Sequence, residues 1–342
     1  MDINKLVRPN VLKLKPYSSA RDDFKGNASV FLDANENPFP SDYNRYPDPH
    51  QWALKEKIAS IKKVKVEQIL LGNGSDEPID LLIRAFCEPS TDNVLIPQPT
   101  YGMYSVSAEV NAVQIKTINL TQDFDIDLDA TRKAWDKNTK LLFLCSPNNP
   151  SGNLLDADKI KILLNEFSGI VIVDEAYIDF TEYGGFVPML NQFPNLVILQ
   201  TLSKAWGLAS IRLGMCFASM EIISLLNKIK PPYNINGITQ KIALERLSQI
   251  ESKNNSATKI VKEREIVKIA LLQIPSVQKV YPSQANFLLV KIQSAKSVYE
   301  KLTSKGIVLR DRSNVILCNE CLRITIGTPQ ENEILISELK KL

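Results

Sequence analysis

The sequence predicts an α/β protein, with a mostly parallel mixed sheet flanked by helices, followed by a smaller α+β domain. Short apolar runs alternate with helical patterns from residue 52 to residue 218, which is typical of strands joined by crossover helices. Beyond residue 273 the apolar runs are short and separated by turns. The length of 342 residues suits two domains, since a domain usually has about 100–200 residues.

The expected elements follow in chain order. Residues 1–33 show little periodicity and are expected to form an arm that packs with the small domain. The helices expected are 52–62, 79–86, one starting near residue 101, 157–166 and a long helical region at 239–273. The strands expected in the large domain are 69–71, 94–96, 141–145, 169–173, 196–200 and 212–218. The strands expected in the small domain are 277–281, 287–290, 307–309 and 322–326.

One connection has a predicted direction. The strand at 212–218 follows Lys204 too closely for a helical crossover, which needs about a dozen residues, so it should run antiparallel. The domain boundaries that follow are 1–33 for the arm, 34–238 for the large domain and 239–342 for the small C-terminal domain.

Composition narrows the class of protein. A net charge of +3 argues against nucleic-acid and anionic-membrane partners, and no apolar run approaches the 18 residues of a membrane span. The five cysteines are an odd number in a long chain with no secretory segment. We therefore expect a soluble protein in a reducing cytoplasm.

The segment TLSKAWG at residues 201–207 is the strongest chemical signal, and Arg212 follows it closely. It comes directly after a predicted buried strand, so the Lys204 amine is expected at the carboxyl edge of the sheet, where open α/β folds build ligand sites. A partly desolvated lysine beside other cations loses proton affinity and can form a Schiff base. Thr201, Ser203 and Arg212 suit a phosphate group. Alone, the segment also fits an ordinary surface turn.

A second anion-binding signal lies at residues 72–77, where GNGSDE follows one predicted strand and opens a helix. Glycines, a serine and an exposed helix N-terminus present backbone N–H groups to an anion. In isolation the segment also fits a simple helix N-cap with acidic residues in the first turn. Two such elements after two different strands favour a phosphate site.

Four further polar or aromatic residues follow the ends of predicted strands. Asp174 can pair with a protonated pyridine nitrogen and keep the ring an electron sink. Tyr177 and Asn149 can bind a ring oxygen, and Tyr101 offers an aromatic face for stacking. Each residue taken singly also fits a cap, a turn or a core position. Together with Lys204 they supply the groups that pyridoxal 5'-phosphate (PLP) needs, which makes PLP the predicted cofactor.

The order of these motifs resembles that of fold-type I PLP aminotransferases. The residues within and around these motifs are similar to those of the histidinol-phosphate aminotransferase family. The resemblance covers nearly the whole chain, from about residue 8 to residue 328. The matching segments are KPY at 15–17, LDANENP at 32–38, NRYPD at 44–48, GSDE at 74–77, PPYN at 231–234, LRD at 309–311 and LRITIGT at 322–328.

The resemblance implies a role for each matching residue. The implied catalytic residues are Lys204, Asp174 and Tyr177, with Lys204 carrying the cofactor and moving protons. The implied cofactor contacts are Lys204, Gly74, Ser75, Asp76, Tyr101, Asn149, Asp174, Tyr177, Thr201, Ser203, Arg212 and Tyr46. Tyr46 in such enzymes reaches the cofactor phosphate of the partner subunit, which implies a homodimer. The implied substrate contacts are Tyr17, Asn35, Arg310 and Arg323.

The resemblance also implies a reaction: transfer of the amino group of L-histidinol phosphate to 2-oxoglutarate, giving imidazole acetol phosphate and L-glutamate in histidine biosynthesis. Histidinol phosphate has no α-carboxylate and ends in a phosphate ester. The pocket must therefore accept a phosphate in one half-reaction and a carboxylate in the other. Arg310, Arg323 and Tyr17 suit that double requirement better than one arginine would.

Two positions depart from the family pattern. Many relatives have glycine where Ser210 stands, and phenylalanine or tyrosine where Trp206 stands. Both changes lie beside the lysine loop and affect its packing, but neither removes a chemical group.

Three alternatives stay open: a PLP decarboxylase of threonine phosphate, an aromatic aminotransferase, and a catalytically silent PLP-fold scaffold.

His50 is the single histidine, which argues against a histidine-based triad or metal site. Cys318 and Cys321 have half the spacing of a zinc site, but no second pair accompanies them, so no metal is expected.

Overall fold

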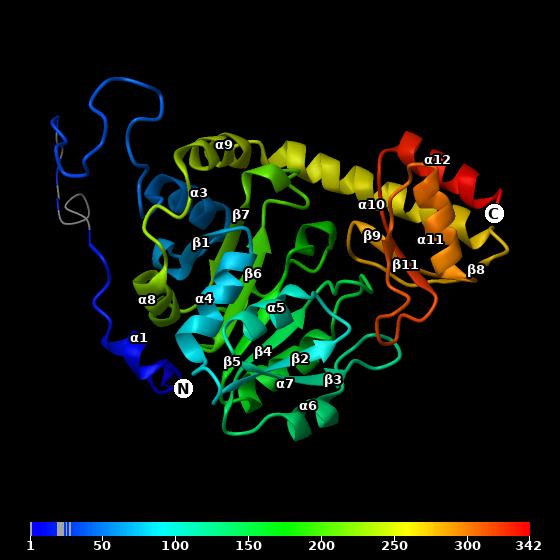
Figure 1. Ribbon diagram of the computed structural model, residues 1–342, viewed down its shortest axis with the longest axis horizontal. Helices are drawn as coiled ribbons and strands as arrows, with labels where there is room; N and C mark the ends of the chain where they lie inside the picture. Colours follow the sequence, from blue (N-terminus) through cyan, green and yellow to red (C-terminus); the bar gives the residue numbers. More distant parts are fainter. Residues whose placement is uncertain (1, 19–23, 25, 27–28) are drawn as a thin grey trace.

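The computed structural model describes residues 2–18, 24, 26 and 29–342, and a seven-stranded mixed sheet forms the centre of its larger unit (Figure 1). The strand order is β1-β7-β6-β5-β4-β2-β3. The strands are β1 (Ile69–Asn73), β2 (Asn93–Gln98), β3 (Gln114–Asn119), β4 (Thr139–Cys145), β5 (Ile170–Asp174), β6 (Leu196–Thr201) and β7 (Leu213–Phe217). Strands β2 to β6 are parallel, whereas β7 is antiparallel to both β6 and β1, which confirms its predicted direction.

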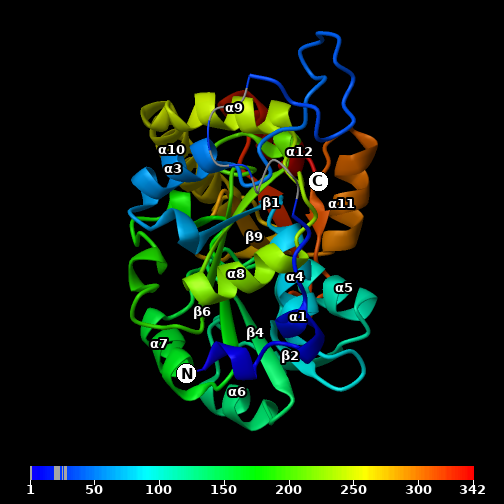
Figure 2. The same ribbon diagram turned by 90° about the vertical axis from the view of Figure 1, so that its left-hand side faces the viewer.

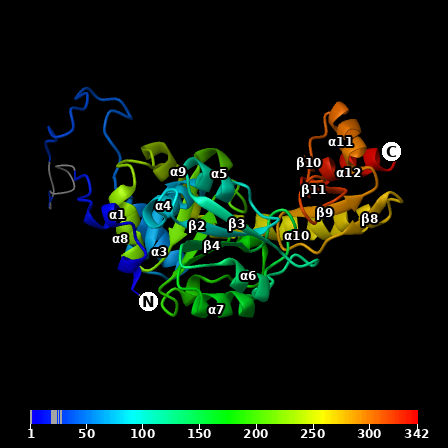
Figure 3. The same ribbon diagram turned by 60° about the horizontal axis from the view of Figure 1, so that its bottom comes forward.

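Helices cover both faces of this sheet (Figures 2 and 3). The helices of one face are α1 (Pro9–Lys13), α4 (Asp76–Phe86), α5 (Met103–Val110) and α8 (Met220–Ile229). The helices of the other face are α3 (Trp52–Lys62), α6 (Leu128–Ala134), α7 (Ala157–Glu166) and α9 (Gly237–Leu247). Short 3₁₀ helices are η1 (Ile3–Lys5), η2 (Val66–Gln68), η3 (Ile178–Phe180), η4 (Val187–Met189) and η5 (Ala209–Ile211).

Alternate residues of each inner strand point into two separate cores. In β4, Leu141 and Phe143 pack on the α4 and α5 side, and Leu142 and Leu144 pack on the α7 side. Such strands are apolar at nearly every position because helices cover both of their faces. This continuous apolarity is what made them detectable in the sequence.

Strand β3 is the element of the large sheet that the sequence did not reveal. Its residues, QIKTIN, mix polar and apolar side chains and are exposed or half-buried. It lies at the edge of the sheet and pairs with β2 alone. An edge strand needs less apolar surface than a central one, so its pattern resembles a loop.

The smaller unit contains a four-stranded antiparallel sheet of order β10-β11-β9-β8. Its strands are β8 (Val277–Val280), β9 (Phe287–Ile292), β10 (Arg310–Asp311) and β11 (Cys321–Thr325). Its helices are α10 (Ile250–Leu272), α11 (Ala295–Ser304) and α12 (Pro329–Leu339). Two expectations are corrected: the strand predicted at 307–309 starts instead at Arg310, and the helical region predicted at 239–273 is two helices, α9 and α10.

The beginning of the chain packs on the large unit. Ile3, Val7 and Val11 are buried in one core cluster with α4 and α8, and Lys228 Nζ donates to the Leu12 carbonyl oxygen at 2.9 Å. This part of the arm therefore does not pack with the small domain as predicted, because its apolar side chains are buried against α4 and α8. The boundaries 1–33, 34–238 and 239–342 stay predictions.

The sequence analysis expected neither a membrane-spanning segment nor a metal site, and the structure bears on both expectations. Within residues 2–18 and 29–342, no helix combines the length and apolarity needed to cross a bilayer. All five cysteines are buried and free. Over the described part of the chain, no group of three or more His, Cys, Asp or Glu side chains is placed to hold a metal ion.

Gly214→Ala tests the contact between β7 and the residue 72–77 segment. A Cβ atom at Gly214 would overlap the carbonyl group of Gly74 and the backbone nitrogen of Ser75. We expect the free energy of unfolding, measured with urea, to fall by about 1–3 kcal/mol because backbone atoms must shift. Gly102→Ala is the control, since nothing lies within 4 Å of a Cβ there. Equal midpoints for the two variants would contradict this account.

Candidate active site

A pocket at the carboxyl edge of the large sheet collects most of the predicted cofactor residues. It is lined by Ser75, Asp76, Tyr101, Cys145, Asn149, Asp174, Ala176, Tyr177, Thr201, Ser203, Lys204 and Arg212. All except Cys145 and Ala176 belong to the predicted set. These residues come from segments at or after the ends of β1, β2, β4, β5 and β6, which is the usual place for ligand sites in open α/β sheets.

Asp174 is a buried carboxylate at the end of β5. It is 3% exposed, its Oδ2 accepts a hydrogen bond from the Tyr104 hydroxyl at 2.6 Å, and its Oδ1 accepts one from the Ala176 N–H at 3.0 Å. Burial raises the pKa of Asp174, while the two hydrogen bonds oppose that rise. A buried carboxylate without an ion pair calls for a cationic partner in the pocket.

Tyr104 is a site residue that the sequence analysis missed. It is fully buried on α5, stacks on the Phe143 ring with a centroid distance of 4.8 Å and donates to Asp174. In the sequence it resembles an ordinary core aromatic. One signal was available: it follows Tyr101 by three residues at the start of a helix, a spacing that brings two side chains to the same side.

Lys204 lies in the loop after β6, with its Nζ 5.6 Å from the centre of the Tyr177 ring. The surrounding protein first, and then the Arg323 guanidinium, lowers the pKa of Lys204 below that of a free lysine. The charge of Asp174 opposes this shift. A larger fraction of neutral amine, which is the nucleophilic form, follows from the lowered pKa.

Gly74 contacts Arg212, which lines the pocket. The Gly74 N–H donates to the Arg212 carbonyl oxygen at 2.7 Å, and a Cβ atom at Gly74 would lie 2.5 Å from Arg212 Nη2. Gly74 has a φ of 72°, and Arg212 has a φ of 55°, which is uncommon for a residue with a side chain. Left-handed residues of this kind concentrate at functional sites.

Asp76 joins two of the predicted cofactor residues. Its Oδ2 pairs with Arg212 Nη2 at 3.4 Å, and its Oδ1 accepts a hydrogen bond from the Tyr101 hydroxyl at 3.1 Å. Thr201 and Ser203 lie on the same side and share a hydrogen bond of 3.0 Å between their hydroxyls. Three hydroxyl or guanidinium groups therefore converge where a phosphate would bind.

Asn149 connects the pocket to the small sheet. Its Nδ2 donates to the Tyr177 hydroxyl at 3.4 Å, and its Oδ1 accepts from Arg323 Nη1 at 2.6 Å. Arg323 lies on β11, with its guanidinium 5.3 Å from the centre of the Phe287 ring. The predicted substrate arginine thus reaches the cofactor pocket from the other unit.

The turn that carries Asn149 is held by internal hydrogen bonds. Asn148 Nδ2 donates to Ser151 Oγ at 2.8 Å, and Ser151 Oγ donates to Asn153 Oδ1 at 2.6 Å. Asn148 and Asn149 are both buried, and Asn148 Nδ2 also donates to the Pro99 carbonyl oxygen at 3.0 Å.

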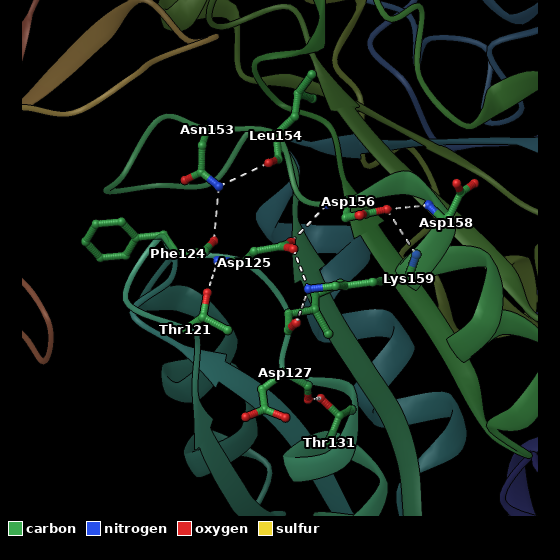
Figure 4. A network of polar contacts seen from close by, with 11 residues as sticks. Thr121, Phe124, Asp125, Asp127, Thr131, Asn153, Leu154, Asp156, Asp158 and Lys159 are labelled. Carbon is green, nitrogen blue, oxygen red and sulfur yellow. Dashed lines mark hydrogen bonds and ion pairs between the residues drawn. The ribbon is translucent and has the colours of Figure 1, made fainter.

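A second layer of contacts anchors that turn to the neighbouring loop (Figure 4). Asn153 Nδ2 donates to the Phe124 carbonyl oxygen at 3.0 Å. Asp125 pairs with Lys159 Nζ at 2.6 Å and accepts the Asp156 N–H at 2.9 Å. The start of α7 and the turn are therefore fixed to the same loop.

Six predicted residues are not among those that line this pocket. Two of them, Gly74 and Arg323, contact lining residues, namely Arg212 and Asn149. The other four are Tyr46, Asn35, Tyr17 and Arg310. Tyr46 and Asn35 line a separate groove beside α9, where Tyr46 stacks on Tyr233 at 4.6 Å. Tyr17 is 71% exposed in the arm, and α1 and the small unit lie at opposite ends of the molecule (Figure 1). Arg310 pairs with Arg323 across β10 and β11. One chain alone does not bring Tyr17, Asn35 and Tyr46 to Lys204.

The chemistry of these groups fits the predicted PLP. A lysine with a lowered pKa, a buried carboxylate in need of a cation, and the hydroxyl and amide of Tyr177 and Asn149 match the aldehyde, the pyridine nitrogen and the ring oxygen. The glycine at position 74 leaves space beside a guanidinium for a phosphate.

Comparison with known proteins places the chain among similar sequences and folds. Residues 28–339 match the family model for aminotransferase class I and II. The histidinol-phosphate aminotransferase of Parabacteroides distasonis is 56% identical over 341 residues, covering 100% of this chain and 99% of the relative. A crystal structure of the Clostridium acetobutylicum histidinol-phosphate aminotransferase has a TM-score of 0.81 at 26% identity, covering 88% of this chain and 91% of that chain. The Sinorhizobium meliloti enzyme in complex with pyridoxal-5'-phosphate has a TM-score of 0.80 at 22% identity, covering 90% of this chain and 89% of that chain.

Tyr104→Phe tests the hydrogen bond that holds Asp174. Near pH 8 we expect the free energy of unfolding to fall by about 1–3 kcal/mol, because a buried carboxylate loses its donor. The loss further raises the folded-state pKa of Asp174. Its cost is therefore absent below the unfolded-state value of about 3.9, where both states are protonated, and grows as pH rises through the folded-state pKa.

Urea unfolding at about pH 5 and about pH 8 measures this dependence. Tyr299→Phe is the matched control, because the Tyr299 hydroxyl forms no hydrogen bond with any described residue. An identical loss at both pH values, or no loss at either, would argue against the assigned contact.

Proposed function

The chain belongs to the class I and II aminotransferase family, and from that premise we propose that it is a PLP-dependent transaminase acting on L-histidinol phosphate and 2-oxoglutarate. The products are imidazole acetol phosphate and L-glutamate. The observation that carries the proposal is that the Lys204 amine and the buried Asp174 carboxylate line one pocket, which Arg323 approaches from the small unit. Relatives more than half identical over their full length support the choice of substrate.

When bound, PLP supplies an aldehyde that takes up an amino group and a ring that accepts electrons. We assign Lys204 to its attachment, Asp174 to the pyridine nitrogen, and Asn149 and Tyr177 to the ring oxygen. Tyr101 supplies a stacking surface. The residues assigned to the phosphate are Gly74, Ser75, Thr201, Ser203 and Arg212, with Asp76 orienting Arg212 and Tyr101.

Lys204 is also assigned the proton transfers. Its Nζ, when free, would take a proton from the substrate carbon that bears the amino group and would give that proton up later in the reaction. The lowered pKa increases the fraction of neutral amine, which is the form that accepts a proton. Asp174 stabilises positive charge on the ring nitrogen, and Tyr104 holds that carboxylate in place.

Arg323 and Arg310 are assigned to the anionic end of the substrate. The guanidinium of Arg323 is half-buried and already near Tyr177 and Asn149, so an anion there would lie next to the reacting groups. Phosphate and carboxylate both accept charge-assisted hydrogen bonds from guanidinium, which lets one pocket serve both half-reactions.

We further propose a homodimer in the cytoplasm, with Tyr46 acting on the partner's cofactor. Much of the segment at residues 29–48 extends away from the body (Figure 1), and large apolar side chains in it are exposed. These exposed side chains are Val30, Leu32, Phe39, Tyr43 and Tyr46. Exposed apolar surface of this extent is typical of a protein interface. Tyr17 and Asn35, which one chain leaves far from Lys204 or in a separate groove, are also assigned to the assembled site.

The first experiment is an absorbance spectrum of the purified protein mixed with histidinol phosphate and no oxo acid. Loss of the long-wavelength band of the bound cofactor supports the proposal. A change driven by aromatic amino acids alone would indicate an aromatic aminotransferase, and release of carbon dioxide a decarboxylase. A cofactor band that no amine shifts would favour the scaffold.

Lys204→Ala and Arg323→Ala separate chemistry from binding. Lys204→Ala should lower kcat by about 10³-fold or more, because the attachment point and the proton acceptor are lost together. Arg323→Ala should mainly raise KM for both substrates, by about tenfold, because a charge-assisted contact is lost. Lys301→Ala, an exposed lysine of α11, is the control for lost charge. Unchanged kinetics in Arg323→Ala would exclude the anion-pocket assignment.

Mixed dimers test whether Tyr46 acts across the interface. Tyr46→Ala and Lys204→Ala chains are each impaired alone, but a mixed dimer contains one subunit with its own Lys204 and the partner's Tyr46. Random reassociation should therefore recover about a quarter of wild-type activity, since half of the dimers are mixed and each has one complete site. No recovery above the sum of the two variants would place Tyr46 in its own subunit's site or outside both.

A further inference from the structure

Three arginines share one face of the hairpin formed by β10 and β11. Arg310 is the Cα partner of Arg323, and the Arg312 N–H donates to the Cys321 carbonyl oxygen at 2.9 Å, which continues the pairing. Side chains alternate along a strand, and directly opposed residues of antiparallel strands share a face. Arg310 and Arg312 are therefore on the face from which Arg323 reaches the Phe287 ring. The sequence analysis assigned nothing to Arg312.

No carboxylate neutralises this arginine cluster (Arg310, Arg312 and Arg323). Over the described residues none of the three forms an ion pair with Asp or Glu, and the polar side-chain contact of Arg323 is the neutral amide of Asn149. The adjacent Asp311 pairs with Leu322, so it alternates to the opposite face, where it accepts the Ser313 N–H.

The cluster is also partly removed from water. The Nε atoms of Arg312 and Arg323 are buried and have no hydrogen-bond partner. Burial, and then the guanidiniums of Arg323 and Arg310, lowers the pKa of Arg312, while Cys318 and Tyr177 oppose that shift. Like charges held together with unused donors cost free energy, and an anion bound between them would offset that cost.

We propose that Arg312 is a specificity-determining residue, which favours a phosphate monoester over a carboxylate in the substrate pocket; this inference rests on the proposed function. A phosphate monoester carries a charge of about −1.5 to −2 and three acceptor oxygens. A carboxylate has one charge and two oxygens, which a single guanidinium can satisfy. A third arginine therefore matches the donor that ends in phosphate, and adds little for the oxo acid.

The test compares two simple anions as ligands of the PLP-loaded protein, butyl phosphate and pentanoate, by calorimetry. Arg312→Gln should raise the Kd of butyl phosphate about tenfold and that of pentanoate less than about threefold. Arg312→Lys should restore most of the difference because it keeps the charge. Lys301→Gln, which removes one exposed charge from the same unit, should change neither Kd.

The pH dependence adds a readout that a purely structural role would not move. The effect of Arg312→Gln on butyl phosphate should shrink below about pH 6, where the phosphate loses its second charge. Equal weakening of both anions, or no weakening, overturns the inference. Conversion of histidinol phosphate is measured in a separate assay. If the wild-type protein binds butyl phosphate through Arg312 but does not convert histidinol phosphate, the inference about phosphate holds and the proposed reaction is refuted.

Discussion

The register of three parallel strands is the constraint on which the site depends. Cys145 at the end of β4 is paired with Asp174 at the end of β5, and Asp174 is paired with Leu199 of β6. The loops that follow therefore begin at one level, so Asn149 and Lys204 arrive beside Asp174. A slip of one residue would turn every side chain of a strand to its other face, and two apolar cores oppose that slip.

The pocket combines groups that are costly to bury with partners that make burial tolerable. Over the described residues, Asp174 accepts two hydrogen bonds but forms no ion pair, and Arg323 has an amide partner but no carboxylate partner. In the proposed function each incomplete pairing is matched by a ligand charge of the opposite sign: the ring nitrogen for the carboxylate and the substrate anion for the guanidinium. In that proposal the two ligands supply the charges that Asp174 and Arg323 lack as partners.

Sequence patterns predicted the inner strands and the residues that follow them, because buried parallel strands are continuously apolar and the chemistry-bearing segments come directly after them. They failed where local pattern carries little information. The edge strand β3 mixes polar and apolar residues. The strand at Arg310 is fixed by its pairing with Arg323, and not by the apolar residues that precede it. Tyr104 belongs to the site only because it bonds to Asp174, 70 positions away in the sequence. The packing of the first residues on α8 likewise follows from a surface that exists only after folding.

The meeting of Gly74 with Arg212 and Gly214 also has a consequence for how the protein is made. Strand β1 pairs within the large sheet only with β7, and the salt bridge of the site joins residues 136 positions apart. As a ribosome delivers the chain from its N-terminus, the apolar β1 must wait, unpaired, until β7 emerges. The region proposed for the cofactor's phosphate is therefore among the last parts of the large unit to be completed, and the unpaired strand is exposed to wrong partners during synthesis.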